Sequence, residues 1–113
     1  MDLINAEKLE ELQSLSDGDN ELLITLLDKY IPNVDKYMTQ AKTEYSAGNT
    51  ENMEFIFHTL KGSSLSLGLT EIGGVMSDLN QRAKNGEFDN FEPEFDTIIA
   101  MLAKVKEYRA TFK

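Results

Sequence analysis

The sequence contains no cysteine and no tryptophan, and it has a single histidine among its 113 residues. The absence of cysteine excludes disulfides and thiolate metal sites and is typical of a reducing compartment. No apolar run approaches the ~18 residues that a membrane-spanning helix needs, and the opening residues lack the basic region and apolar stretch of a signal peptide. We therefore expect a cytoplasmic protein without membrane insertion.

Positive charge is also scarce, since 11 lysines and arginines are outnumbered by 20 aspartates and glutamates, for a formal net charge of −9. Such a chain repels nucleic acid and anionic bilayers, so its expected partners are proteins. The sequence has no glycine-rich phosphate loop and no paired-metal carboxylate motif, and its length leaves no room for an ATP-binding lobe. We expect one domain over residues 1–113, a monomer with no cofactor or metal of its own and no kinase activity.

Apolar residues recur with helical spacing almost throughout, and no segment has the alternation of a convincing strand. Four substantial amphipathic helices joined by short turns predict an all-α fold. The expected architecture is an up-down four-helix bundle with one or two short N-terminal capping helices. The expected helix starts are Asn5, Asp19 or Asn20, Asn49 or Thr50, Thr70, and Asp89 or Asn90.

Two features interrupt these helical patterns. Pro32 removes a backbone donor inside the second helix, which predicts either a break at Ile31 or a kink. Gly73 and Gly74 lie inside the fourth helix, where each costs about 1 kcal/mol relative to alanine. The glycine pair therefore predicts a close contact with a neighbouring helix.

The histidine lies in the stretch HTLKGSSLSLG, residues 58–68. At about 100° per residue, His58 points roughly 150° away from the centre of the apolar stripe of its helix. The imidazole should therefore face outward. Its neighbours three, four or seven positions away include Phe55, Lys61, Gly62 and Leu65, which places apolar residues on a helix face that is normally polar. The apolar stripe itself consists of Met53, Ile56, Phe57, Leu60, Ser64 and Leu67.

Each of these features also has a plainer interpretation. A lone histidine is more often a surface or packing residue than a reactive group. Phe55 and Leu65 can pack under the N-terminal helix, because the buried sector of a bundle helix is wide. Lys61 can be a solvated charge, and Gly62 can serve helix packing. Ser63 and Ser64 are interpreted as small packing residues, since no second histidine exists to activate a hydroxyl.

The stretch HTLKGSSLSLG resembles the signature of histidine phosphotransfer (HPt) domains, the intermediate carriers of phosphorelays. In that family the pattern is a histidine, any residue, an aliphatic residue, lysine, glycine, two small residues and a later glycine. Every place of the pattern is filled here, and the resemblance covers nearly the whole chain. It implies a four-helix bundle with the motif on its second long helix. The matching residues are His58, Leu60, Lys61, Gly62, Ser63, Ser64 and Gly68.

The resemblance also implies roles for individual residues. His58 would accept the phosphoryl group, Lys61 would neutralise its charge, and Gly62 would leave room for the partner beside the docking residues Phe55 and Leu65. A polar residue on the following helix, Asn80 here, would orient the ring, although it is one methylene shorter than the usual residue and can equally be a surface side chain. Gln81 is the nearby substitute for Asn80. Lys84 would add positive charge, whereas Arg82 lies on a different face.

The function implied is that of a phosphorelay intermediate between response-regulator receiver domains, with a sensor or hybrid histidine kinase upstream. Magnesium is expected in the partner receiver only. Two alternatives stay open at this point. One is a helical adaptor whose histidine is never phosphorylated, and the other is the related N-terminal module of chemotaxis kinases, usually joined to kinase domains that this chain lacks.

Overall fold

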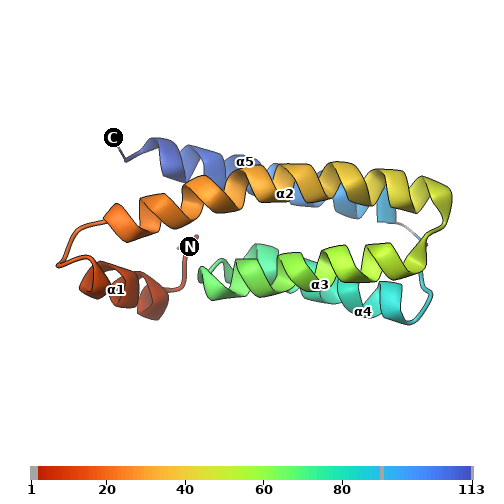
Figure 1. Cartoon of the computed structure of the whole chain (residues 1–113), viewed down its shortest axis with the longest axis horizontal. Coiled ribbons are helices and arrows are strands. Elements are labelled where there is room, and N and C mark those ends of the chain that lie inside the picture. The colour runs from red at the N-terminus through yellow and green to blue at the C-terminus, as the bar shows by residue number, and fades with distance from the viewer. Residues whose placement is uncertain (1–2, 90, 113) are drawn as a thin grey trace.

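The computed structural model describes residues 3–89 and 91–112, and the secondary structure in these ranges is entirely helical. The predicted all-α bundle is confirmed, with one short N-terminal helix and four long helices. The long helices alternate in direction along the molecule, as Figure 1 shows. The five helices are α1 (Ala6–Leu15), α2 (Glu21–Ala47), α3 (Thr50–Ser66), α4 (Thr70–Lys84) and α5 (Phe91–Ala110).

The starts of α1 and α3 and the end of α2 follow the capping signals of the sequence. The side chain of Asn5 accepts a hydrogen bond from the backbone N–H of Lys8 at 3.2 Å, and the side chain of Asn49 accepts one from the backbone N–H of Asn52 at 3.3 Å. Gly48 ends α2 in the left-handed conformation, with φ of 71°, which glycine adopts at little cost. The predicted start at Asn90 lies outside the described residues.

Pro32 does not break α2, which continues through it from Glu21 to Ala47. Of the two predicted alternatives, a break at Ile31 or a kink, the break is therefore wrong. Pro32 and Asp28 are both exposed. Because the carbonyl of Asp28 loses its helical donor on the solvent side, water can replace the lost hydrogen bond. The helix thus continues through a position where the sequence alone favoured an interruption or kink.

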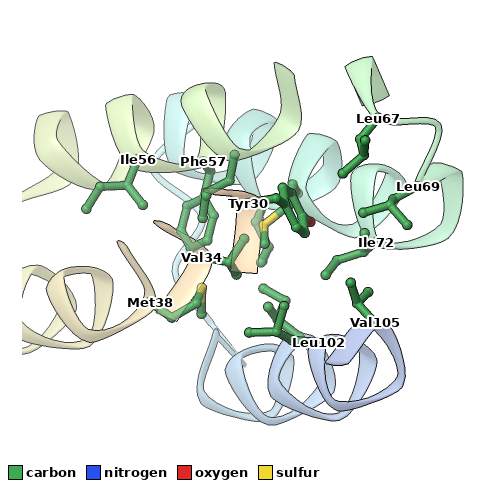
Figure 2. Packing of buried hydrophobic residues seen from close by; sticks show 14 of the residues in the cluster. Tyr30, Val34, Met38, Ile56, Phe57, Leu67, Leu69, Ile72, Leu102 and Val105 are labelled. Carbon is green, nitrogen blue, oxygen red and sulfur yellow. The ribbon is translucent and has the colours of Figure 1, made fainter. Parts of the chain in front are cut away.

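The core lies between the four long helices. Figure 2 shows Tyr30 and Val34 from α2, Phe57 from α3 and Leu102 from α5 converging on the interior. Ser64, predicted as a small packing residue, is fully buried among them. Its hydroxyl is hydrogen-bonded to the Tyr30 hydroxyl at 2.7 Å, and burial raises the pKa of Tyr30 to about 12. This pair satisfies two polar groups that would otherwise be costly in an apolar interior.

The N-terminal segment fills the space below the first half of α2, because α2 is longer than the hairpin formed by α3 and α4 (Figure 1). The backbone N–H of Asn5 donates to the carbonyl oxygen of Gly68 at 2.7 Å. Gly68 has φ of +79°, and a Cβ there would come within 2.7 Å of Lys8 Cβ and 3.1 Å of Ile4 Cγ2. The last glycine of the motif is therefore the point where α1 joins the bundle.

Two ion pairs connect α5 to α2. Arg109 forms a bidentate pair with Asp28, with Nε 2.6 Å and Nη2 3.2 Å from the two carboxylate oxygens. Lys106 Nζ lies 3.2 Å from an oxygen of Asp35. The hydrogen bond from Arg109 holds the pKa of Asp28 below its usual value. In the described ranges, no helix is long and apolar enough to cross a membrane.

Only one of the two glycines inside α4 is in a close contact. Gly73 is buried, and a Cβ there would lie 2.5 Å from Leu65 Cδ2 on α3. Gly74 is exposed, and a Cβ there would meet nothing within 4 Å. The predicted close helix contact is therefore confirmed at Gly73 and wrong at Gly74.

Candidate functional site

His58 is exposed on the outer side of α3, as its helical phase predicts. The residues at its back, Ile56, Phe57 and Leu60, are buried in the core. These buried neighbours keep α3 from rotating, so the imidazole is held outward by the packing of its own helix. An exposed ring on a rigid helix is open to the approach of a second protein.

Two large apolar side chains are exposed beside the histidine. Phe55 is 61% exposed and Leu65 is 44% exposed. The alternative that both residues pack under the N-terminal helix is therefore wrong. Because α2 is long, α1 is placed beyond the C-terminal end of α3 and leaves this face uncovered (Figure 1). Phe55 and Leu65 place apolar surface around the exposed imidazole of His58. We call Phe55, His58, Gly62 and Leu65 the histidine face.

Gly62 lies one turn after His58 and contributes open space to this face. It is exposed, and a Cβ built on it would have no neighbour within 4 Å. Gly62 therefore has no packing role inside the fold, although packing was one interpretation of the sequence. A glycine in mid-helix costs about 1 kcal/mol relative to alanine, and no contact within the described chain offsets this cost.

Two lysines near the histidine face have no carboxylate partner within the described residues. Lys61 on α3 is half-buried and Lys84 on α4 is exposed, and neither forms a salt bridge there. Their ammonium groups are thus available to an anion that binds near His58. By contrast, Arg82 pairs with Glu94 at 3.3 Å and stacks over the Phe91 ring at 4.8 Å, which confirms that it serves a different face.

The register of the α3–α4 hairpin places Asn80 at the level of His58. Leu65 on α3 lies directly over Gly73 on α4. The two helices are antiparallel, so seven residues back along α3 and seven forward along α4 lead to the same level, about 10.5 Å away. Seven residues are nearly two full turns, so His58 shares the face of Leu65 and Asn80 shares the face of Gly73. By the same register, Lys84 lies one turn further along.

Asn80 is buried, with 8% of its surface exposed, so its interpretation as a surface residue is wrong. Its Oδ1 atom is buried without a hydrogen-bond partner in the described part of the chain. A buried carbonyl oxygen without a partner is costly and uncommon, since most such groups are satisfied. The described residues include no hydrogen bond between Asn80 and His58. Asn80 therefore has unused hydrogen-bonding capacity at the level of the imidazole.

The sequence-based substitute for Asn80 is engaged elsewhere. Gln81 is exposed, and its Nε2 donates to Oδ1 of Asn85 at 3.3 Å, at the C-terminal end of α4. It is one position away from Asn80, which turns it by about 100° around the helix. Of the two amides, only Asn80 shares the α3-facing side of α4 with Gly73.

The sequence did not predict a groove that borders this region between α2 and α3. Its volume is about 240 Å³, and Ser63 and Ser66 on α3 form one wall. Ser63 is exposed rather than packed in the core, and its hydroxyl donates to the Leu60 carbonyl at 3.3 Å. The groove depends on how two helices meet, which the spacing within one helix does not reveal. It is lined by Leu26, Lys29, Tyr30, Asn33, Ser63, Ser66 and Leu67.

Comparison with known proteins gives a consistent family. The family model described as the Hpt domain matches residues 25–108 of this chain. The phosphorelay intermediate protein rdeA of Dictyostelium discoideum is 24% identical over 98 residues, which cover 87% of this chain. The same match covers 39% of the rdeA sequence, so the chain spans well under half the length of that relative.

Two solved structures share the fold. The crystal structure of histidine-containing phosphotransfer protein B from Pseudomonas aeruginosa superposes with a TM-score of 0.84 at 20% identity, covering 98% of this chain and 97% of the other. An X-ray structure from rice, of a candidate histidine-containing phosphotransfer protein, gives a TM-score of 0.63 at 18% identity. That match covers 92% of this chain and 84% of the rice chain.

Proposed function

Because the chain belongs to the Hpt domain family, we propose that it is a phosphorelay intermediate that carries a phosphoryl group on His58. It would receive the group from the aspartyl phosphate of one receiver domain and pass it to the aspartate of another. The observation that carries this proposal is the exposed imidazole of His58, bordered by the empty space over Gly62. A partner's active site needs that space to bring its aspartate in line with the ring.

The proposed transfer is a displacement at phosphorus. The lone pair of the His58 ring nitrogen farther from the backbone attacks the phosphorus of the aspartyl phosphate, and an N–P bond forms as the P–O bond to the aspartate breaks. The aspartate leaves as a carboxylate with the electron pair of that bond. The reverse displacement, by the carboxylate of a second receiver, returns the imidazole to its starting state.

The surrounding residues have proposed supporting roles. The Lys61 ammonium, one turn from His58, would neutralise charge on the equatorial oxygens of the transferred group, and Lys84 would add weaker long-range attraction. The unpartnered Asn80 Oδ1 lies at the level of the ring. We assign Asn80 to orient the imidazole by accepting its other N–H, directly or through a water molecule.

Other parts of the reaction would come from the partner. The proposal assigns magnesium and the remaining catalytic groups to the receiver domain, and it assigns phosphate entry to an upstream sensor or hybrid kinase. The chain itself would have no kinase activity and would act as a monomer in the cytoplasm. In residues 3–89 and 91–112 no group of three or more His, Asp or Glu side chains is placed to hold a metal ion.

A second candidate function is a helical adaptor that binds receivers or other signalling proteins without being phosphorylated. The exposure of Phe55 and Leu65 favours a docking role in either case. The two functions differ only in the chemistry at His58.

The experiment is to mix the protein with a phosphorylated receiver domain and follow the label. We expect an acid-labile, base-stable phosphate on His58. The His58→Gln variant should take up no label and yet bind the receiver with unchanged affinity. Binding without any label in the unmodified protein, while the receiver stays active toward another carrier, would support the adaptor and overturn the carrier.

A further inference from the structure

Leu65 lies in a notch on α4 that exists because residue 73 has no side chain. A Cβ on Gly73 would lie 2.5 Å from Leu65 Cδ2, 2.9 Å from its Cγ and 3.5 Å from its backbone nitrogen. The first two distances are shorter than any ordinary carbon contact, so the leucine occupies the volume that an alanine methyl would take. The position of the Leu65 side chain therefore depends on Gly73.

The notch also sets how far Leu65 projects from the surface. Leu65 is 44% exposed, so one side of it rests on α4 and the other faces solvent. A side chain with a free side responds to crowding by moving toward that side, because no neighbour opposes it. A methyl group at residue 73 would thus push Leu65 outward and change the outer surface more than the core.

Leu65 belongs to the histidine face, two turns after His58 and about 10.5 Å along α3. Gly62 lies between these two residues, and its position is open. A receiver domain that brings its aspartate to His58 while covering Gly62 would extend over Leu65. How far the Leu65 side chain projects from the surface then decides how closely the partner can approach.

We propose that Gly73 is a positioning residue for partner recognition, acting through Leu65. Because residue 73 has no side chain, Leu65 lies against the backbone of α4. The receiver therefore meets a flat apolar surface instead of a projecting side chain. The complementary surface on the partner is apolar at that point. This inference rests on the proposed function, since it assumes that a receiver docks on the histidine face.

The experiment compares four variants with the unmodified protein: Gly73→Ala, Leu65→Ala, the double variant L65A/G73A, and Gly74→Ala as the matched control. Gly74 neighbours Gly73 in the same helix but is open to solvent. For each protein, the dissociation constant for one receiver and the transfer rate at saturating receiver are measured, together with the thermal unfolding midpoint.

We expect Gly73→Ala to weaken receiver binding by about tenfold, because the displaced Leu65 would overpack its contact with the partner. The transfer rate at saturation should not change, because His58 and Asn80 are untouched. In the Leu65→Ala background the Gly73→Ala change should have no further effect, since the clash is gone. Gly74→Ala should leave binding unchanged. If Gly73 had a purely structural role, Gly73→Ala would change the unfolding midpoint, and its effect on receiver binding would not depend on Leu65.

Three results would overturn the inference. The first is unchanged receiver binding in Gly73→Ala. The second is that Gly73→Ala weakens receiver binding equally with Leu65 and with alanine at position 65. The third applies if Gly73→Ala does not fold, and it is a difference in receiver affinity between L65A/G73A and Leu65→Ala. Labelling of His58 in the unmodified protein distinguishes failure of this inference from failure of the proposed function. If the unmodified protein is labelled, an unexpected result with the variants contradicts only the role of Gly73. If the unmodified protein neither takes up label nor binds the receiver, the proposed function and the inference are both overturned.

Discussion

The α2–α5 seam and the α3–α4 seam use their charged residues differently. Between α2 and α5, the cations Arg109 and Lys106 are paired with aspartates at distances of 2.6 and 3.2 Å. Within the described ranges no ion pair links α3 to α4, and Lys61 and Lys84 have no carboxylate partner. Lys61 and Lys84 beside the histidine are therefore available to an incoming anion, whereas Arg109 and Lys106 connect α5 to α2.

The two seams also differ in the size of the side chains that fill them. Tyr45 of α2 stacks on Phe91 with ring centroids 5.8 Å apart and meets the edge of Phe95 at 5.6 Å, so large rings fill the α2–α5 seam. At the α3–α4 seam, Leu65 instead rests on Gly73. Substitutions on the histidine face should therefore alter phosphoryl transfer, and substitutions at the α2–α5 seam should alter folding.

The largest effect in this comparison is expected from Lys61→Met, which keeps most of the aliphatic stem and removes the ammonium. The rate of transfer to His58 should fall by about ten- to hundredfold, because a charge-assisted hydrogen bond is worth roughly 1.5–3 kcal/mol. Rapid-quench kinetics with a labelled receiver measure it. The control is Lys104→Met on α5, which is exposed and should transfer normally. Equal losses in both variants would show that net charge and not position matters.

A smaller loss, of about tenfold in transfer rate, is expected from Asn80→Ala, because the ring loses its orienting group. The free energy of unfolding should change by less than about 1 kcal/mol, since the removed carbonyl oxygen has no partner to lose. The control is Ser64→Ala, which strands the Tyr30 hydroxyl. It should destabilise the fold by about 1–2 kcal/mol and leave transfer unchanged. The reverse pattern would make Asn80 a packing residue.

Gly62→Ala should weaken receiver binding by about fivefold while stabilising the isolated protein by up to about 1 kcal/mol. The stabilisation is expected because nothing lies within 4 Å of the added methyl, and the loss of binding because the methyl projects toward the partner. Gly74→Ala on α4 should give the same stabilisation without the binding defect. Titration with a receiver and thermal unfolding test the pair, and identical affinities would remove Gly62 from the docking surface.

The smallest effect is expected at the α2–α5 seam, from Asp28→Asn. The folded-state pKa of Asp28 is lowered by the hydrogen bond from Arg109, so its contribution to stability is present above the unfolded pKa, about 3.9. That contribution is lost as the pH falls through the lower folded value. Because the pair is exposed, the unmodified protein should unfold only about one or two degrees higher than the variant at pH 7.

The difference in unfolding midpoint should vanish at pH values below the folded pKa of Asp28. Unfolding curves of both proteins between pH 2 and 7 measure it, and the rate of transfer to His58 should be equal at pH 7. A transfer defect in Asp28→Asn would contradict the division between the two seams.

The helices and the direction of His58 could be predicted because both follow from local rules. Asn5 and Asn49 cap helices through their own side chains, and Gly48 ends one through its own backbone conformation. The outward direction of His58 needs only the period of the helix and the apolar residues within it. No knowledge of the other helices enters these predictions.

What could not be predicted depends on relations between helices or with solvent. The adjacent Gly73 and Gly74 are alike in sequence, and only the position of Leu65 on another helix separates their roles. The burial of Asn80 follows from the register of α3 against α4. That register is fixed by the same contact between Leu65 and Gly73. The continuity of α2 through Pro32 depends on which side of the helix faces water.

The stretch of residues 58–68 is divided by the turn of its helix. His58, Lys61 and Gly62 lie toward the outside, whereas Ser64, Leu67 and Gly68 are buried, and Gly68 receives the backbone of the N-terminal segment. A sequence pattern that is recognised as one unit therefore contains two sets of constraints, one for the exposed residues and one for the buried residues. On the proposed function, a change at His58 should leave the fold intact and stop phosphoryl transfer, whereas a side chain at Gly68 should disturb the attachment of the first helix.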